Sequence, residues 1–283
     1  MASQLARTAQ PWALKNLPPF RPVAVKLLRL TAQDDVPLNR IQAVLRTDVA
    51  FSAEVLRLAN SALIGSRNEV GSVAHAVALL GLERLKALSM TIAMRDFLST
   101  SKSSTAMQLY WKYNLATAAI CEWLAGLLSI QTDAGYTAGL IHDIGRLGIL
   151  RAHPEEYERM LSVIEEHGFD LLRSEKDLFD IDHCEAGRYL LDRWQFPADL
   201  RDVAALHHRE PGPETPILVT IVYIGWQIAD MLGYSPFDIR SADTIEEIAA
   251  ALPEVARRRI FSHLDEVAGI VTQKLAAAES VHV

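Results

Sequence analysis

The chain has 283 residues, of which half are hydrophobic and 22% are charged, with a formal net charge of −7. This composition is typical of a folded soluble protein and weighs against a nucleic-acid partner, whose phosphates require positive charge. Two cysteines and no hydrophobic segment of about 20 residues argue against a disulfide framework and a membrane span. We therefore expect a cytoplasmic protein.

The first half predicts short helices behind an N-terminal extension. Residues 1–16 show no strong pattern and are expected to be loosely docked, and residues 17–101 form the N-terminal helical half. Asp48 is placed to cap a helix whose hydrophobic residues recur at helical spacing. That helix carries Asn60 and Ser61 near its end, beside the hydrophobic stripe. We expect both to hydrogen-bond to backbone in a buried structural role.

Two further helices complete this half. Ser72 is placed to cap the first, which covers residues 73–80, and Gly81 is expected to end it. A second helix is predicted over residues 82–98. A polar stretch then marks a boundary, and residues 102–233 are expected to form a helical bundle.

The bundle is predicted from helical periodicity and from helix caps. A long helix covers about residues 105–128, and Asp133 is placed to cap the next one. That helix runs through His142–Asp143 and is expected to be interrupted by Gly145 and Gly148. Asp182 is placed to cap a later helix. No segment alternates as a strand does, so the chain is predicted to be all-α.

The C-terminal residues 234–283 predict a helical extension with weaker signals. Its amphipathic helices could mediate a homodimer, or they could pack on their own bundle. The sequence leaves both readings open.

Five residues of the second half can bind metal ions: His142, Asp143, His183, His207 and His208. Imidazole and carboxylate groups suit zinc, manganese or iron. A single inward histidine, however, is more often a hydrogen-bonded core residue. Because these residues come from different helices, their spacing does not decide between the two readings.

The order of several short motifs is similar to that of the HDOD proteins, which are relatives of the HD metal-dependent phosphohydrolases. The first-half motifs are Leu17–Pro19, Thr47–Phe51, Arg57–Ala62 and Val73–Gly81. The second-half motifs are Tyr110–Asn114, Gly139–Gly145, His183–Gly187 and Leu206–His208. The resemblance covers about residues 15–233 and implies a helical subdomain packed on an HD-like bundle.

The resemblance also implies that two ligands of the catalytic HD enzymes are missing. Tyr113 stands where the first histidine is expected, and Trp226 stands where the last aspartate is expected. An indole offers no lone pair and a neutral phenol is a poor ligand, so no cofactor is expected. Asp143 would then cap a helix or pair with Arg146.

A divalent metal remains the alternative, since histidines also follow at positions where binuclear HD enzymes have extra ligands. The residues of such a site would be His142, Asp143, His183 and His207.

The resemblance implies a non-enzymatic module of bacterial signal transduction. Its expected partners are signalling proteins acting in trans, such as receiver, kinase or cyclic-dinucleotide proteins. A small nucleotide bound in the former HD pocket is a further reading. The alternative function is a diverged metal-dependent phosphohydrolase acting on nucleotides or cyclic dinucleotides. Neither nucleic acid nor a membrane is expected as a partner.

Overall fold

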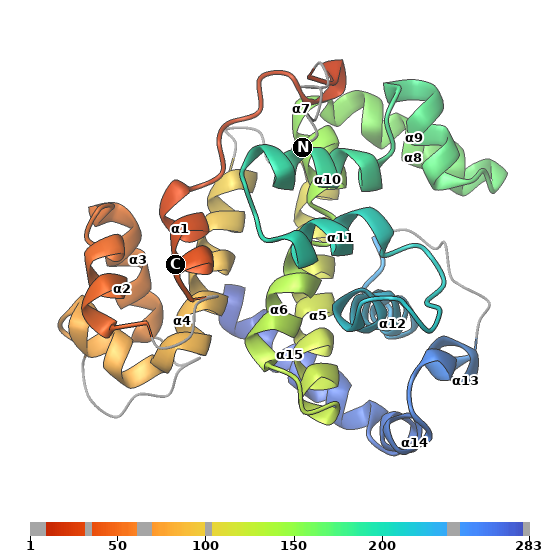
Figure 1. The fold of residues 1–283 in the computed structure, drawn as a ribbon. Helices are drawn as coiled ribbons and strands as arrows, with labels where there is room; N and C mark the ends of the chain where they lie inside the picture. The colour runs from red at the N-terminus through yellow and green to blue at the C-terminus, as the bar shows by residue number, and fades with distance from the viewer. Residues whose placement is uncertain (1–9, 32–35, 61–69, 100–103, 237–243, 280–283) are drawn as a thin grey trace, which may run out of the picture.

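The computed structural model describes residues 10–31, 36–60, 70–99, 104–236 and 244–279. These residues form helices and connecting turns, without a strand among them, which confirms the predicted all-α class (Figure 1). No helix in the described ranges is both long and hydrophobic enough to cross a membrane.

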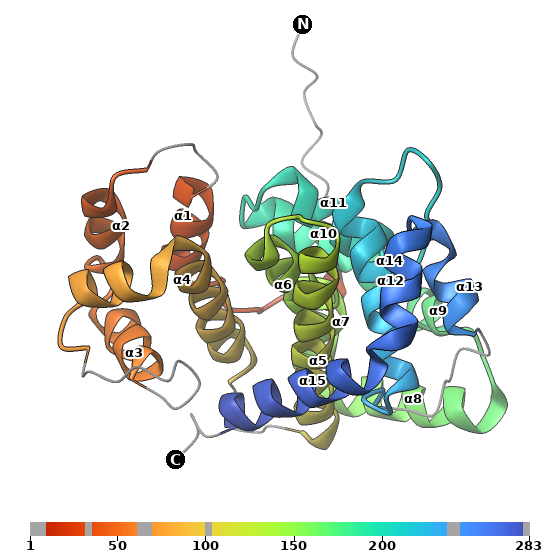
Figure 2. The same ribbon diagram turned by 90° about the horizontal axis from the view of Figure 1, so that it is seen from below.

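The first four helices form a lobe beside the rest of the molecule (Figures 1 and 2). They are α1 (Pro22–Thr31), α2 (Leu38–Leu45), α3 (Val49–Ala59) and α4 (Val73–Leu98). The second half contributes α5 (Thr105–Leu127), α6 (Thr132–Ile141), α7 (Ile144–Ala152), α8 (Pro154–His167), α9 (Leu171–Phe179), α10 (His183–Arg193), α11 (Ala198–Leu206) and α12 (Ile217–Met231). One continuous hydrophobic core joins the two halves. The expected boundary at residues 101–102 lies outside the described residues.

Two predicted caps of the first lobe are confirmed. The Asp48 carboxylate accepts a hydrogen bond from the Phe51 amide at 3.0 Å, and the Ser72 hydroxyl accepts one from the His75 amide at 3.1 Å. The helices predicted on either side of Gly81 are also found, joined as α4 with a kink at that residue, whose φ is 71°. A positive φ costs glycine little, which explains why the change of direction falls there.

Asn60 has a structural role, but the expectation that it is buried is wrong. Its side chain is exposed and pairs with both backbone groups of Val70, at 2.7 and 3.0 Å. The neighbouring Ser61 lies outside the described residues.

The start of α6 differs from the prediction. Asp133 does not cap this helix, because Gln131 occupies the N-cap position. Asp133 instead lies in the first turn, where it is buried and forms an ion pair with Lys86 of α4 at 2.8 Å. The carboxylate therefore ties the bundle to the first lobe.

The two glycines after the His-Asp pair do not interrupt a helix, contrary to the prediction. The break falls at His142–Asp143, and α7 runs through Gly145 and Gly148. A Cβ atom on Gly145 would lie 2.0 Å from the His183 carbonyl oxygen of α10. The glycine is needed for a close helix contact.

Both ends of the described chain pack on the bundle. A short 3-10 helix at Trp12–Leu14 buries Leu14, and the Trp12 indole donates to Asp180 at 2.8 Å, so this part of the extension is docked firmly, not loosely.

The C-terminal extension contains α13 (Ile245–Ile248), a 3-10 turn (Ala249–Ala251), α14 (Glu254–Ser262) and α15 (Leu264–Glu279). Helix α15 lies across α5 (Figure 2), with Val267 and Val271 buried and Lys274 paired with Glu122. Its apolar face therefore packs on its own bundle.

Candidate functional site

The predicted His-Asp pair occupies the two-residue break between α6 and α7. His142 is the C-cap of α6, and its Nδ1 lies 2.7 Å from the Gly139 carbonyl oxygen. Asp143 is the N-cap of α7, but its side chain makes no capping hydrogen bond. Both side chains are only 1% exposed. The break turns the imidazole and the carboxylate inward, toward α10 and α11.

Helix ends bring three more histidines to the same place. His183 is the first residue of α10, His207 is the C-cap of α11, and His208 follows it. The Nε2 atoms of His183 and His207 each lie 3.5 Å from Asp143 Oδ1, and His142 Nε2 lies 3.9 Å from Asp143 Oδ2. His208 Nε2 is 3.0 Å from His183 Nε2. The structure therefore brings all five predicted residues together, four histidines and the Asp143 carboxylate.

In His142, His183 and His207, the second ring nitrogen, Nδ1, faces an oxygen acceptor. His142 Nδ1 faces Gly139 O, His207 Nδ1 faces Ala204 O at 3.1 Å, and His183 Nδ1 faces the Glu175 carboxylate at 2.6 Å. A carbonyl or carboxylate oxygen only accepts, so Nδ1 must carry the hydrogen. The Nε2 lone pairs are left facing Asp143. This is the arrangement that orients histidine ligands in metal sites.

Arg146 places a permanent positive charge inside this cluster. Its Nε lies 3.3 Å from Asp143 Oδ2, its Nη2 lies 3.1 Å from His183 Nε2, and its Nη1 donates to the Tyr110 hydroxyl at 3.3 Å. This confirms the expected pairing of Asp143 with Arg146 and not the helix-capping alternative. Burial alone would raise the pKa of Asp143, but the Arg146 charge outweighs burial and holds that pKa well below its usual range. The pair is therefore ionised.

His142, His183 and His208 are neutral at physiological pH, because burial lowers the pKa of each ring. Burial lowers the pKa of His142 to about 3, and burial also lowers the pKa values of His183 and His208 well below the usual range. Behind His183, burial raises the pKa of Glu175 to about 7. The Glu175 side chain is fully buried and accepts hydrogen bonds from Tyr157 and from the His183 amide.

This buried group could bind a metal ion. His142, Asp143 and His207 offer ligand atoms that lie within 4.8 Å of one another, and His183, Cys184, His207 and His208 form a second such group. Both oxygens of Asp143 and the Nε2 of His207 lack a hydrogen-bond partner among the described residues. Nitrogen and oxygen donors of this kind suit zinc. The donor set fits one divalent ion, although the ion would lie beside the Arg146 guanidinium.

Tyr113 and Trp226 lie beside the cluster, as the resemblance placed them. The Tyr113 ring is 6.0 Å from that of His142. The Trp226 indole donates to the His207 carbonyl oxygen at 2.9 Å, and its ring lies 5.0 Å from that of His208. Trp226 and His208 are only partly buried and form the outer edge of the cluster.

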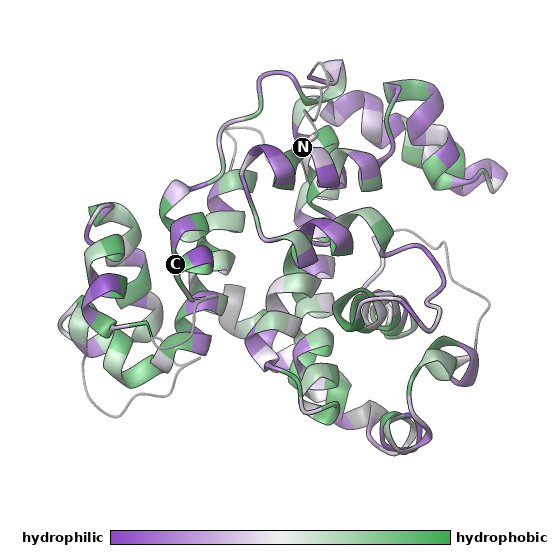
Figure 3. Cartoon of the chain, viewed as in Figure 1, coloured by the Kyte–Doolittle hydropathy of each residue, from purple (hydrophilic) through white to green (hydrophobic). Residues whose placement is uncertain are grey.

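Asp230, which was not predicted from the sequence, also lies beside Tyr113. It follows Trp226 by one turn on α12, is 8% exposed, and interacts with the Tyr113 hydroxyl. Burial raises the pKa of Asp230 to about 6. The sequence could have indicated this position. Asp230 is four residues after Trp226, so the two share a helix face, and the residues of this helix are mainly hydrophobic (green in Figure 3).

Glu175 was also missed from the sequence. It lies four residues after Leu171 and four before Phe179, which places it on the buried face of α9. A carboxylate among inward hydrophobic residues is rarely buried without a partner, and this pattern could have identified it.

A comparison with curated proteins finds a relative that is similar in sequence over most of this chain. An uncharacterised protein of Treponema pallidum (strain Nichols) is 26% identical over 231 residues, which are 80% of this chain and 44% of that protein. The chain thus spans less than half the length of this curated relative.

Three solved bacterial structures share the fold. An HDOD domain protein of unknown function from Geobacter sulfurreducens has a TM-score of 0.75 at 23% identity, covering 91% of this chain and 93% of that one. A protein named as a candidate phosphohydrolase from Shewanella amazonensis SB2B has a TM-score of 0.71 at 24% identity, covering 96% and 99%. A protein named as a candidate signal transduction protein from Marinobacter aquaeolei VT8 has a TM-score of 0.75 at 19% identity, covering 94% and 60%.

At these identities the structures establish the fold alone. The family itself is established by the HDOD domain model, which matches residues 17–210. This range includes the motifs of both halves and every histidine of the cluster. The chain therefore belongs to the HDOD domain family.

Proposed function

We propose that this chain is a non-enzymatic regulatory module that acts in bacterial signal transduction by binding a partner protein. The observation that carries the proposal is the position of Arg146, whose guanidinium neutralises Asp143 inside the cluster. A metal-dependent hydrolase uses such a carboxylate to hold its ion, whereas here a side chain of the same helix supplies the positive charge.

Burial supports the same conclusion. The side chains of His142, Asp143, His183 and His207 are at most 1% exposed. A phosphoester substrate has to reach the water that attacks it, and a charged substrate would have to leave solvent to do so. A buried ion pair with histidines from neighbouring helix ends around it is better suited to holding α6, α7, α10 and α11 together. The name of the Marinobacter protein is consistent with a role in signalling.

The alternative is a diverged phosphohydrolase acting on nucleotides or cyclic dinucleotides, and the assembled donors favour it. His142, Asp143 and His207 would hold the ion, with His183 next to them. When bound, a divalent ion would lower the pKa of a coordinated water and so supply a nucleophile. Arg146 would still place its charge beside that ion. The name of the Shewanella protein is consistent with this reading.

Metal content and turnover distinguish the two functions. The protein would be purified without a histidine tag, with zinc and manganese supplied in the growth medium, and its metal measured by mass spectrometry. We expect far less than one ion per chain and no hydrolysis of model phosphodiesters. The matched variants are His142→Ala and His75→Ala, because His75 is exposed and lies in the first lobe. One ion per chain and turnover that are lost in His142→Ala but kept in His75→Ala would refute the proposal.

The partner is inferred to be another protein of the signalling pathway, such as a receiver or kinase. We also place the protein in the cytoplasm, because Cys121 and Cys184 are both free thiols. A nucleotide ligand is the less favoured reading, since Arg146 is already paired with Asp143 and the rings of His142, His183 and His208 are neutral.

A further inference from the structure

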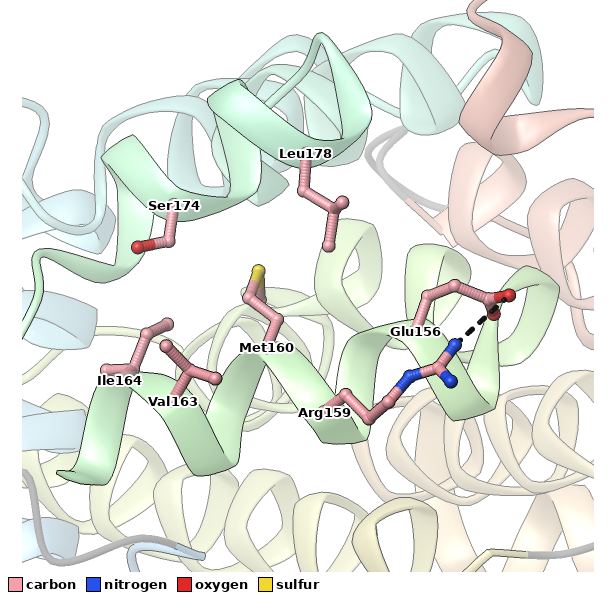
Figure 4. Close-up of a pocket in the computed structure, with 7 residues that line it drawn as sticks. All are labelled: Glu156, Arg159, Met160, Val163, Ile164, Ser174 and Leu178. Carbon is pink, nitrogen blue, oxygen red and sulfur yellow. Dashed lines mark ion pairs between the residues drawn. The ribbon is translucent and has the colours of Figure 1, made fainter. Parts of the chain in front are cut away.

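Helices α8 and α9 form a hairpin at one edge of the molecule (Figure 1). A groove lies between them (Figure 4). The groove has a volume of about 290 Å³. Its lining residues are Glu156, Arg159, Met160, Val163 and Ile164 of α8, and Ser174 and Leu178 of α9. Figure 4 shows Leu178 of α9 pointing toward the α8 row.

The groove has a hydrophobic floor and exposed hydrophobic walls. Met160 and Ile164 are 8% and 2% exposed, whereas Val163 and Leu178 are 46% and 45% exposed. Phe169, in the turn of the hairpin, is 54% exposed. Hydrophobic side chains gathered at one surface commonly mark a contact site, and methionine adapts well to the shape of a partner.

The hairpin also carries much of the negative charge of the protein. Residues 154–179 contain eight carboxylates and three lysine or arginine residues, a formal net charge of −5 compared with −7 for the whole chain. All of these carboxylates except Glu175 lie at least partly at the surface. Glu155 and Glu166 lie one turn from Arg159 and Val163 respectively, so they flank the groove.

We propose that the α8–α9 groove docks an amphipathic helix of a partner protein that has large hydrophobic residues on one face and lysines or arginines beside it. Its volume is at the lower limit of small-molecule pockets, typically about 300 Å³ or more, and suits one or two large hydrophobic side chains. A helix laid in a hydrophobic groove anchors itself with such side chains at helical spacing. The proposal rests on the proposed regulatory function and names its partner surface.

Charge excludes the other occupants that the groove would otherwise accept. An anionic nucleotide or an anionic membrane would be repelled by the acidic rim. A second copy of this chain, docked through the same hairpin, would set two surfaces of net negative charge against each other. The negative charge around the groove attracts a basic helix, whereas it repels nucleotides, anionic membranes and a second copy of the hairpin.

The docking surface is connected to the histidine cluster through the hairpin. Tyr157, on the inner face of α8, donates to Glu175 of α9, and Glu175 in turn holds His183. Met160 and Ile164 of the groove lie on the same helix as Tyr157. This gives the module a physical route from its surface to its centre.

The test uses a short synthetic helical peptide with leucines on one face and lysines on the other, labelled with fluorescein. Its affinity for the full chain would be measured by fluorescence anisotropy, and its position mapped by NMR of the valine, leucine and methionine methyl groups. A second peptide carries glutamates in place of the lysines. We expect the lysine peptide to bind, more weakly as salt is raised, with shifts at Val163, Met160 and Leu178.

Leu178→Glu and Leu79→Glu form a matched pair, because the two leucines are 45% and 44% exposed and each change adds one negative charge. Loss of a central anchor weakens binding by roughly tenfold or more, so we expect this loss in Leu178→Glu and none in Leu79→Glu. Val163→Glu provides a second variant at the groove. Near-equal affinity across the variants, or equal binding of the glutamate peptide, would overturn the proposal.

Two further outcomes are informative. A wild-type dimer that Leu178→Glu converts to a monomer would assign the groove to a second copy of this chain and overturn the proposal. Phosphoester turnover would refute the proposed function whatever the peptide does, whereas failure of the peptide test without turnover would refute the docking surface alone.

Discussion

Replacing His142 with glutamine tests whether the centre of the cluster is a buried neutral imidazole. The His142 side chain is 1% exposed, and burial lowers the pKa of its ring to about 3, compared with 6.5 for an unperturbed histidine. Glutamine can still offer an N–H group to the Gly139 carbonyl oxygen but does not titrate. The variant should be less stable than the wild type at pH 7, because the new side chain fits this site poorly.

The difference between the two proteins should shrink as the pH falls. Above pH 6.5 neither state protonates His142, so the stability that the neutral ring contributes is fully present. Below pH 6.5 the unfolded chain binds a proton that the folded protein excludes until about pH 3, and stability is lost across this window. Between pH 6.5 and 5 the loss is about 2 kcal/mol, at about 1.36 kcal/mol per pH unit. Because His142→Gln does not undergo this loss, the difference in free energy of unfolding between the variant and the wild type should decrease by about 2 kcal/mol over the same pH range.

The assay is urea unfolding at pH 7, 6 and 5 with a chelator present, comparing the wild type with His142→Gln. His75→Gln is the control, since His75 is exposed. Glu175, whose pKa is raised to about 7, gives stability that is lost as the pH rises from about 4.5 to 7. That opposite contribution is common to all three proteins and cancels in the comparison. A deficit of His142→Gln that does not change with pH would refute the buried neutral ring.

Two further predictions concern the neighbours of His142. Arg146→Met leaves the Asp143 carboxylate buried without its cation, so the free energy of unfolding, measured with urea, should fall by about 3–5 kcal/mol. The double variant Arg146→Met with Asp143→Asn should recover much of this stability. If the effects of the two single substitutions simply add, the ion pair is contradicted. Gly145→Ala should lower the free energy of unfolding by about 3 kcal/mol, because its Cβ would meet the His183 backbone at 2.0 Å. A Cβ on Gly148 meets only the ends of leucine side chains, the nearest at 2.9 Å, so Gly148→Ala should lower it by about 1 kcal/mol or less. Equal melting temperatures for the two glycine variants would show that α7 and α10 are not in close contact.

The sequence by itself determined the local structure and the family. Asp48, Ser72 and Asp182 are predicted to cap helices, and they do so in the structure, because a cap depends on a few neighbouring residues. Helical periodicity together with the lack of strand alternation gave the all-α class. The ordered motifs of both halves gave the HDOD family, and the histidines and Asp143 were recognised as residues that can share one site.

Only the tertiary structure decided how these residues meet. The sequence alone treats Gly145 as a helix breaker, yet it lies within α7 and admits α10 at close range. Asp133 suits a cap by its position but pairs with Lys86 of another helix. In both cases the deciding atoms belong to helices distant along the chain.

The charge at the centre of the site has the same origin. Asp143 and Arg146 are three residues apart, and the sequence proposed their pairing as one of two alternatives. That Arg146 also reaches His183, and that Glu175 holds the far side of that ring, follows from the packing of α7, α9 and α10. The sequence therefore supplied the chemical groups, and packing between distant helices determined their burial, their protonation and their partners.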